Sequence, residues 1–121
     1  MSQYQEPPIY RAAYDLCLSI IRFVKDCHPD YKATMGALLQ KEALDLLMNV
    51  YRVNEAETQT EKVDMIKGAL NRCYTVRAIS RLLLDLGIIK LETSISLDNK
   101  IEETAKQLSG WKKSCQKAII T

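Results

Sequence analysis

Glycine and proline are scarce in this sequence, with four and three residues among 121. Sandwiches and barrels of β-strands need many turn residues, so this scarcity argues against them and favours long, uninterrupted helices. A run of 18 apolar residues is also absent, which excludes a membrane-spanning helix. The polar first nine residues lack the basic and apolar regions of a secretory signal, so we expect a cytoplasmic protein with no membrane partner.

The side chains that usually carry catalysis or bind metals are also few. His28 is the single histidine, and the sequence has no CxxC pair, no Glu-x-x-His motif and no glycine-rich phosphate loop. We therefore expect no catalytic residue, metal, cofactor or small-molecule substrate, and we predict that the protein is not an enzyme. The cysteines are spread through apolar segments and are expected to be small core residues: Cys17, Cys27, Cys73 and Cys115.

Apolar residues make up 47% of the sequence and charged residues 26%, which is typical of a globular domain. The length suits a single domain, residues 1–121, in which apolar residues recur at three- and four-residue steps in four segments. We expect Gly87 to end the third of these helices in a left-handed conformation. Short connections favour an all-α fold, an antiparallel up-down-up-down four-helix bundle. The predicted helices span about 8–27, 34–54, 60–86 and 94–117.

The third predicted helix carries more apolar surface than a helix in a bundle usually needs. A monomeric bundle requires an apolar stripe somewhat wider than about 100°. Here the apolar residues cover well over half of the circumference, so we expect the surplus to form a contact between subunits. The residues of this apolar arc are Val63, Met65, Ile66, Ala69, Leu70, Cys73, Val76, Ile79, Leu83, Leu84 and Leu86.

Three arginines lie within or beside this apolar arc. Arg77 projects inside it, Arg72 projects near its other members, and Arg81 lies at its edge, four residues from Arg77. A buried, unpaired guanidinium is very costly. Each arginine must therefore form an ion pair, extend its charged end to water, or face a partner.

Two interpretations of these arginines remain open. The first is a set of ion pairs within or between chains, for example to Glu42, Asp45 or Asp85. The second is a basic surface for phosphate or for an acidic protein, to which Lys67 and Tyr74 add a cation and an aromatic ring.

A second basic cluster lies at the end of the fourth predicted helix, where no acidic residue follows Glu103. One interpretation is a solvated face that complements the helix dipole. The other is a binding surface, because a net charge of +2 per chain is repeated in an assembled ring, where weak phosphate contacts add up. The cluster consists of Lys106, Lys112, Lys113 and Lys117.

Two segments resemble a known family. Residues 76–89 (VRAISRLLLDLGII) resemble the arginine-spaced, leucine-rich third helix and Leu-Gly turn of the accessory variability determinant (Avd) proteins of diversity-generating retroelements. Residues 108–114 (LSGWKKS) resemble the family's terminal signature, with Gly110 and Trp111 as its characteristic pair. The segment at 14–16 (YDL) and the helix lengths agree, so the resemblance covers nearly the whole chain. We expect Gly110 to allow close approach of a neighbouring segment and Trp111 to be a large core residue.

The resemblance implies a homo-oligomer, a pentameric barrel of four-helix bundles without a catalytic site. It also implies binding to the retroelement reverse transcriptase and to its template RNA or cDNA, in support of mutagenic cDNA synthesis during mutagenic retrohoming. Arg77 and Arg81 match the family's paired arginines, which belong to the basic surface that engages the polymerase. Two alternatives stay open: an RNA-binding four-helix-bundle protein of the ribosomal intervening-sequence type, and a purely structural oligomer whose arginines form intersubunit ion pairs.

Overall fold

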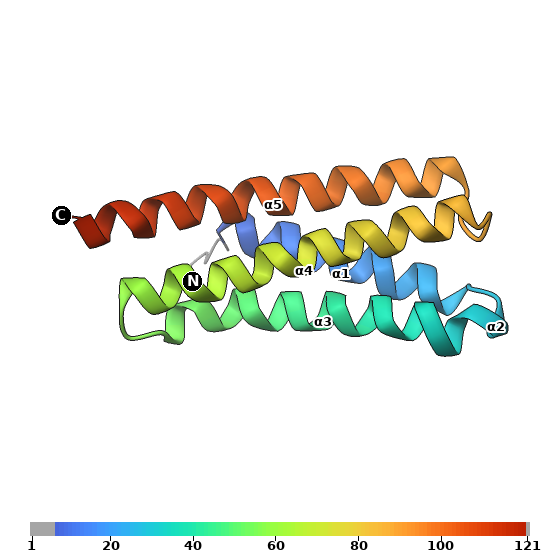
Figure 1. Cartoon of the computed structure of the whole chain (residues 1–121), viewed down its shortest axis with the longest axis horizontal. Coiled ribbons are helices and arrows are strands. Elements are labelled where there is room, and N and C mark those ends of the chain that lie inside the picture. The colour runs from blue at the N-terminus through green and yellow to red at the C-terminus, as the bar shows by residue number, and fades with distance from the viewer. Residues whose placement is uncertain (1–6, 121) are drawn as a thin grey trace, which may run out of the picture.

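The computed structural model describes residues 7–120, in which all regular secondary structure is helical (Figure 1). The prediction of an all-α bundle with four long helices is confirmed over this range. Short turns connect the long helices: α2 Pro29–Tyr31, the π-helical turn η1 Lys32–Gly36 and the 3-10 turn η2 Val53–Glu55. The long helices are α1 Pro8–Lys25, α3 Ala37–Arg52, α4 Gln59–Asp85 and α5 Leu91–Ile120.

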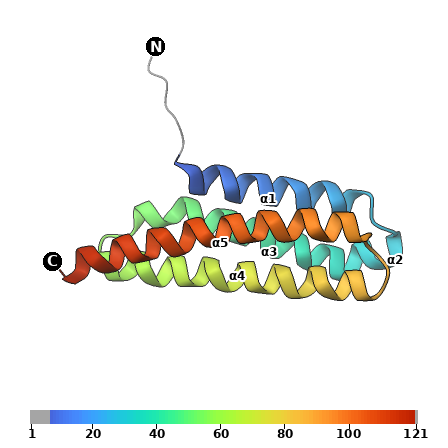
Figure 2. The same ribbon diagram turned by 90° about the horizontal axis from the view of Figure 1, so that it is seen from above.

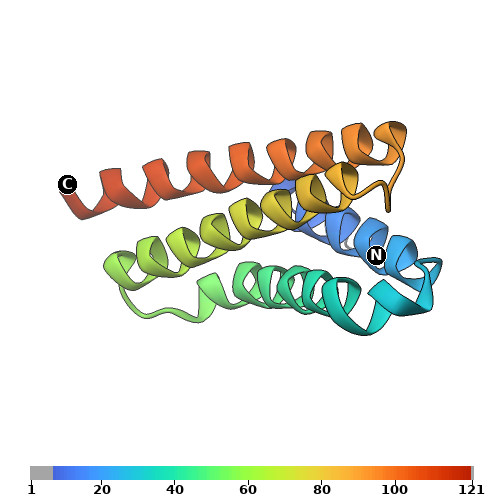
Figure 3. The ribbon, with the colours of Figure 1, turned by 45° about the vertical axis from the view of Figure 1, so that its right-hand side comes forward.

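The four long helices lie side by side, and each runs in the opposite direction to the one before it (Figures 1 and 2). Helix α1 packs on α3, α3 on α4 and α4 on α5, and α5 returns to pack on α1. As a result, α1 begins and α5 ends toward the same end of the bundle. Figure 3 shows that α5 extends past the other helices at this end, where Ile120 is 86% exposed.

Two of the long helical segments begin earlier than predicted. Nδ1 of His28 accepts a hydrogen bond from a backbone N–H two residues further on, and Pro29 occupies the first helical position. Together they start a helical turn at Pro29, whereas the sequence pattern suggested Thr34. Helix α5 starts at Leu91, and Ser94, expected near its start, is buried within the helix.

Local hydrogen bonds fix both ends of α4. Oγ1 of Thr58 accepts from the backbone N–H of Glu61, and the Glu61 carboxylate accepts from the backbone N–H of Glu57, in a variant of the capping box. At the other end Gly87 has a φ of 74°, and the next backbone N–H donates to the carbonyl oxygen of Leu83. This is a Schellman motif, so the predicted left-handed helix end at Gly87 is confirmed.

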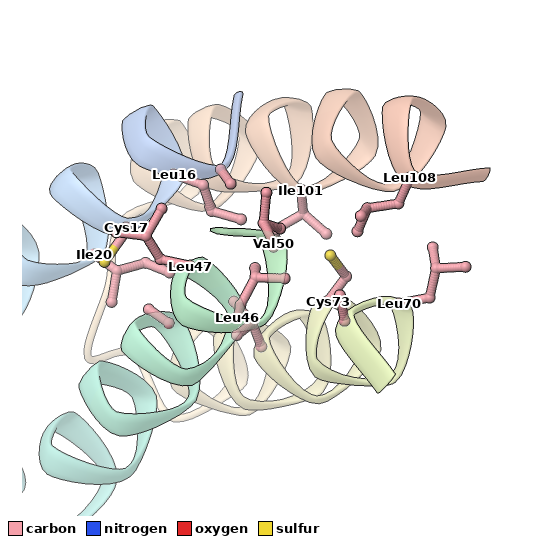
Figure 4. Packing of buried hydrophobic residues seen from close by; sticks show 14 of the residues in the cluster. Leu16, Cys17, Ile20, Leu46, Leu47, Val50, Leu70, Cys73, Ile101 and Leu108 are labelled. Carbon is pink, nitrogen blue, oxygen red and sulfur yellow. The ribbon is translucent and has the colours of Figure 1, made fainter. Parts of the chain in front are cut away.

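The core is a continuous apolar cluster to which all four long helices contribute. In Figure 4, Leu16, Val50 and Ile101 come from three different helices and point toward one another, and none of them is exposed. Three of the four cysteines are buried as expected, and Cys27 is half-buried. Burial raises the pKa of the Cys73 thiol to about 12, so this thiol stays protonated and unreactive at neutral pH.

The apolar arc of α4 is almost completely covered within one chain. Helix α4 packs against α3 on one side and α5 on the other, and a helix with two such neighbours needs a wider apolar stripe. Met65, Ile79 and Leu84 are partly buried against the core, and Leu86 is the member that stays exposed, at 56%. The inference of a surplus for subunit contacts is therefore wrong for this arc. Its buried members are Val63, Ile66, Ala69, Leu70, Cys73, Val76 and Leu83.

Candidate protein and nucleic-acid interface

Arg72 lies on the side of α4 that faces α3. Its Nη1 is 2.9 Å from Oε2 of Glu42 and 3.4 Å from Oδ2 of Asp45. The Glu42 side chain is only 16% exposed, so its pair with Arg72 is largely shielded from water. Asp45 also accepts a hydrogen bond from Nζ of Lys41 at 2.8 Å, and this bond lowers the pKa of the Asp45 carboxyl, with a further contribution from nearby positive charge. Arg72 is thus held in a charged cluster between α3 and α4.

Arg77 and Arg81 have looser partners. Nη2 of Arg77 lies 4.0 Å from Oε1 of Glu102 on α5. Nε of Arg81 lies 3.2 Å from Oδ1 of Asp85, one turn further along α4. The two arginine side chains are 41% and 73% exposed. Because exposed ion pairs contribute only about 0–1 kcal/mol, a phosphate or carboxylate from a partner can replace either of these contacts at little cost.

These contacts agree with the ion-pair interpretation of the arginines. Glu42, Asp45 and Asp85 were candidate partners from the sequence, and each lies within 3.4 Å of an arginine of the same chain. The pair between Arg77 and Glu102 was not anticipated, because it depends on the register between α4 and α5. Ion pairing within the chain is confirmed, and the basic binding surface stays a prediction.

A groove of about 520 Å³ runs between α4 and α5. Tyr74 and Arg77 line it from α4, and Lys106 lines it from α5. The structure therefore brings two predicted site residues, Arg77 and Lys106, to one groove. Glu102 and Glu103 also line the groove, so its charge is mixed rather than purely basic.

The other predicted lysines lie toward the end of the bundle at which α5 finishes. Lys113 and Lys117 are exposed, and Lys112 is half-buried on a different side of the helix. Because α4 and α5 are antiparallel, the first half of α4, with exposed Lys67, runs alongside this part of α5 (Figure 1). Arg72 faces α3 and is separate from this group.

An exposed apolar stripe along the outside of α4 was not anticipated. Tyr74, Leu82 and Leu86 are 54%, 50% and 56% exposed. With Ala78 between them they follow a four-residue spacing, which places them along one side of the helix. That spacing is the sequence signal that could have identified the stripe. Arg81 is exposed on the same helix, next to Leu82 in the chain.

Gly110 and Trp111 have surroundings that differ from those expected. A Cβ atom at Gly110 would meet no other atom of the described residues within 4 Å, so no segment between residues 7 and 120 approaches it closely. A glycine inside a helix costs about 1 kcal/mol relative to alanine, and packing within the chain does not require it. Trp111 is half-buried at the edge of the core, where its ring meets the ring of Tyr10 edge-on, with centroids 6.1 Å apart.

The described residues hold no obvious metal centre. Between residues 7 and 120, no three side chains of histidine, cysteine, aspartate or glutamate are grouped so that they could bind a metal ion. None of the helices in this range has the length and apolar character needed to cross a membrane.

No family model matches this sequence, and no curated protein matches it. The fold is similar to that of a Bacteroides thetaiotaomicron protein of unknown function from the S23 ribosomal protein family, known from a crystal structure. The two structures superimpose with a TM-score of 0.81 at 17% sequence identity, over 87% of this chain and 95% of that chain. The similarity extends over most of both chains, and it shows that this chain shares the all-helical fold of that protein.

Proposed function

We propose that this protein is a non-enzymatic accessory subunit that binds a retroelement reverse transcriptase and its template RNA, as the resemblance to the Avd family implies. One observation carries this proposal: Arg77 and Arg81 are exposed, weakly paired and close along α4 to the apolar stripe of Tyr74, Leu82 and Leu86. Arginine and aromatic side chains together are characteristic of the energetically important part of protein interfaces.

A homo-oligomer, a pentameric barrel, belongs to the same proposal. The apolar arc of α4 does not support an oligomer, because α3 and α5 of the same chain cover that arc. The exposed stripe of Tyr74, Leu82 and Leu86 supports it instead, since exposed apolar side chains in a row favour contact with another protein surface. Light scattering of the purified chain measures the number of subunits.

The polymerase contact is tested by capture of a cognate retroelement reverse transcriptase. We expect Arg77→Ala/Arg81→Ala to weaken capture about tenfold or more, because charge-assisted hydrogen bonds to the partner are lost. Arg11→Ala/Arg22→Ala is the matched control: both arginines are exposed on α1, and Arg11 forms the same kind of one-turn pair, with Asp15. Undiminished capture by a folded Arg77→Ala/Arg81→Ala variant would contradict the assigned role.

A second candidate is a protein that binds RNA alone, of the ribosomal intervening-sequence type. The name of the S23 ribosomal protein family, to which the similar structure belongs, favours this candidate. Binding to RNA without any polymerase, falling steeply as salt rises, would support it, because released counterions drive phosphate contacts. Absence of RNA binding even at low salt, combined with no polymerase capture, would leave a purely structural oligomer.

A further inference from the structure

A pocket of about 450 Å³ lies where the beginning of α1 meets the second half of α5. Figure 2 shows these two segments side by side at one end of the bundle. The volume falls within the range of pockets that hold small organic ligands. Neither the ion pairs nor the proposed function uses this pocket. The residues that form its binding features are Tyr10, Asn54, Lys106, Gln107, Gly110 and Trp111.

Two aromatic rings form one wall of the pocket. The rings of Tyr10 and Trp111 meet at an interplanar angle of 73°, and Tyr10 is only 6% exposed. Tyr10 also stacks on Tyr51, with centroids 5.1 Å apart, and its hydroxyl accepts a hydrogen bond from Nδ2 of Asn54. Contacts with α3 and η2 therefore hold the wall in place before any ligand arrives. A flat ring can stack on the half-buried indole of Trp111.

Gly110 leaves open space next to this wall. It lines the pocket, and a Cβ atom there would meet none of the described atoms within 4 Å. Glycine is among the least favourable residues inside a helix, and packing within this chain does not require one here. The missing side chain keeps the pocket open beside Trp111. A methyl group at this position would take up part of the space available to a ligand.

The charge of the pocket comes from one side chain. Among the described residues that line the pocket, Lys106 is the charged one, and none is an aspartate or a glutamate. Lys106 lies one helical turn before Gly110, is exposed, and has no carboxylate within ion-pair distance among the described residues. The amide groups of Asn54 and Gln107 add polar groups to the lining. An anionic group on a ligand would therefore meet an available cation.

We propose that this pocket binds a small planar aromatic anion. Its ring stacks on the indole of Trp111, in the space that Gly110 leaves open, and its anionic group pairs with the ammonium of Lys106. Ring and charge together define the ligand class, because the lining offers both an aromatic face, that of Trp111, and a cation, Lys106. The proposed polymerase contact through Arg77 and Arg81 does not use this pocket, and Lys106 is the lining residue that also borders the groove between α4 and α5.

The test uses the full chain and three probes: 2-naphthoate, 2-naphthol without the charge, and acetate without the ring. Because Trp111 is the only tryptophan, its indole N–H gives one identifiable signal in a ¹H–¹⁵N spectrum. We expect 2-naphthoate to shift this signal saturably, with a Kd of about 1 mM or tighter. Each of the other two probes should bind at least about tenfold more weakly, a difference of about 1.4 kcal/mol.

Two variants separate the parts of the site. Gly110→Ala should fold and weaken binding of 2-naphthoate at least about tenfold, while Ser109→Ala, the neighbouring control, should not. Lys106→Gln should lower the affinity for 2-naphthoate to that for 2-naphthol, while Lys113→Gln should leave it unchanged. Unchanged binding by folded Gly110→Ala, or no saturable shift in the intact chain, would overturn the proposal. Binding that appears only after removal of residues 1–6, or only on dilution, would also overturn it, because the chain itself or a second copy would then occupy the pocket.

Discussion

Val76→Asp is expected to unfold the protein. Val76 is completely buried on α4, inside the apolar arc that α3 and α5 cover. An aspartate there would place a carboxylate without a partner in an apolar environment, at a cost above about 4 kcal/mol. The total stability of a domain is about 5–15 kcal/mol, so most of the folded population should be lost. Circular dichroism with urea unfolding measures the effect.

Leu82→Asp is the matched control for this experiment. Leu82 lies on the same helix but is 50% exposed, so the same carboxylate would remain in water. We expect this variant to keep the helicity of the parent chain. If Val76→Asp instead stayed folded and only formed smaller particles, the arc would be a subunit contact after all, contrary to its burial within one chain.

Arg72→Met is expected to lower the free energy of unfolding by about 2 kcal/mol. The substitution leaves Glu42 with its side chain largely buried and without its nearest cation. Breaking a fully buried pair costs about 3–5 kcal/mol. The value here is smaller because the Arg72 side chain is 33% exposed and water screens the charge. Chemical denaturation of the purified variant measures the loss.

A double-mutant cycle separates the ion pair from the packing of the arginine stem. Glu42→Gln combined with Arg72→Met should cost less than the two single substitutions added together, because the pair is already absent. Arg81→Met is the control on the same helix and should change stability by less than about 0.5 kcal/mol, since its pair is exposed. Additive effects at positions 42 and 72 would show that their contact does not stabilise the fold.

The helical repeat of apolar residues was sufficient to predict the four long helices and their order. Local signals worked where one residue decides the geometry, as at Gly87. They failed at the starts of the second and fourth predicted helices. His28 caps a helical turn that begins before the predicted start near residue 34, and Ser94, the predicted start of the fourth helix, is buried within α5. The prediction of a subunit contact from the width of the apolar arc was wrong because α4 has a neighbouring helix on each side, and both neighbours cover the arc.

The candidate site was less predictable than the fold. Partners for the arginines could be guessed on α3 and α4, yet Glu102 required the register of α4 against α5. The pocket between α1 and α5 joins residues about a hundred positions apart, so no spacing in the sequence indicates it. The missing side chain of Gly110 was noticed in the sequence, but no described segment of the chain fills the space that it leaves, which forms part of the pocket.

The return of α5 to α1 has a consequence for the order of folding. Three helix pairs join consecutive helices, and the fourth pair joins the two ends of the chain, whose closure costs more entropy. We expect the fourth pair to form after the transition state. Trp111→Ala should then mainly accelerate unfolding, whereas Leu46→Ala, in α3, should also slow refolding in stopped-flow measurements. The aromatic wall of Tyr10 and Trp111 would accordingly be completed last and be the first part of the bundle to open.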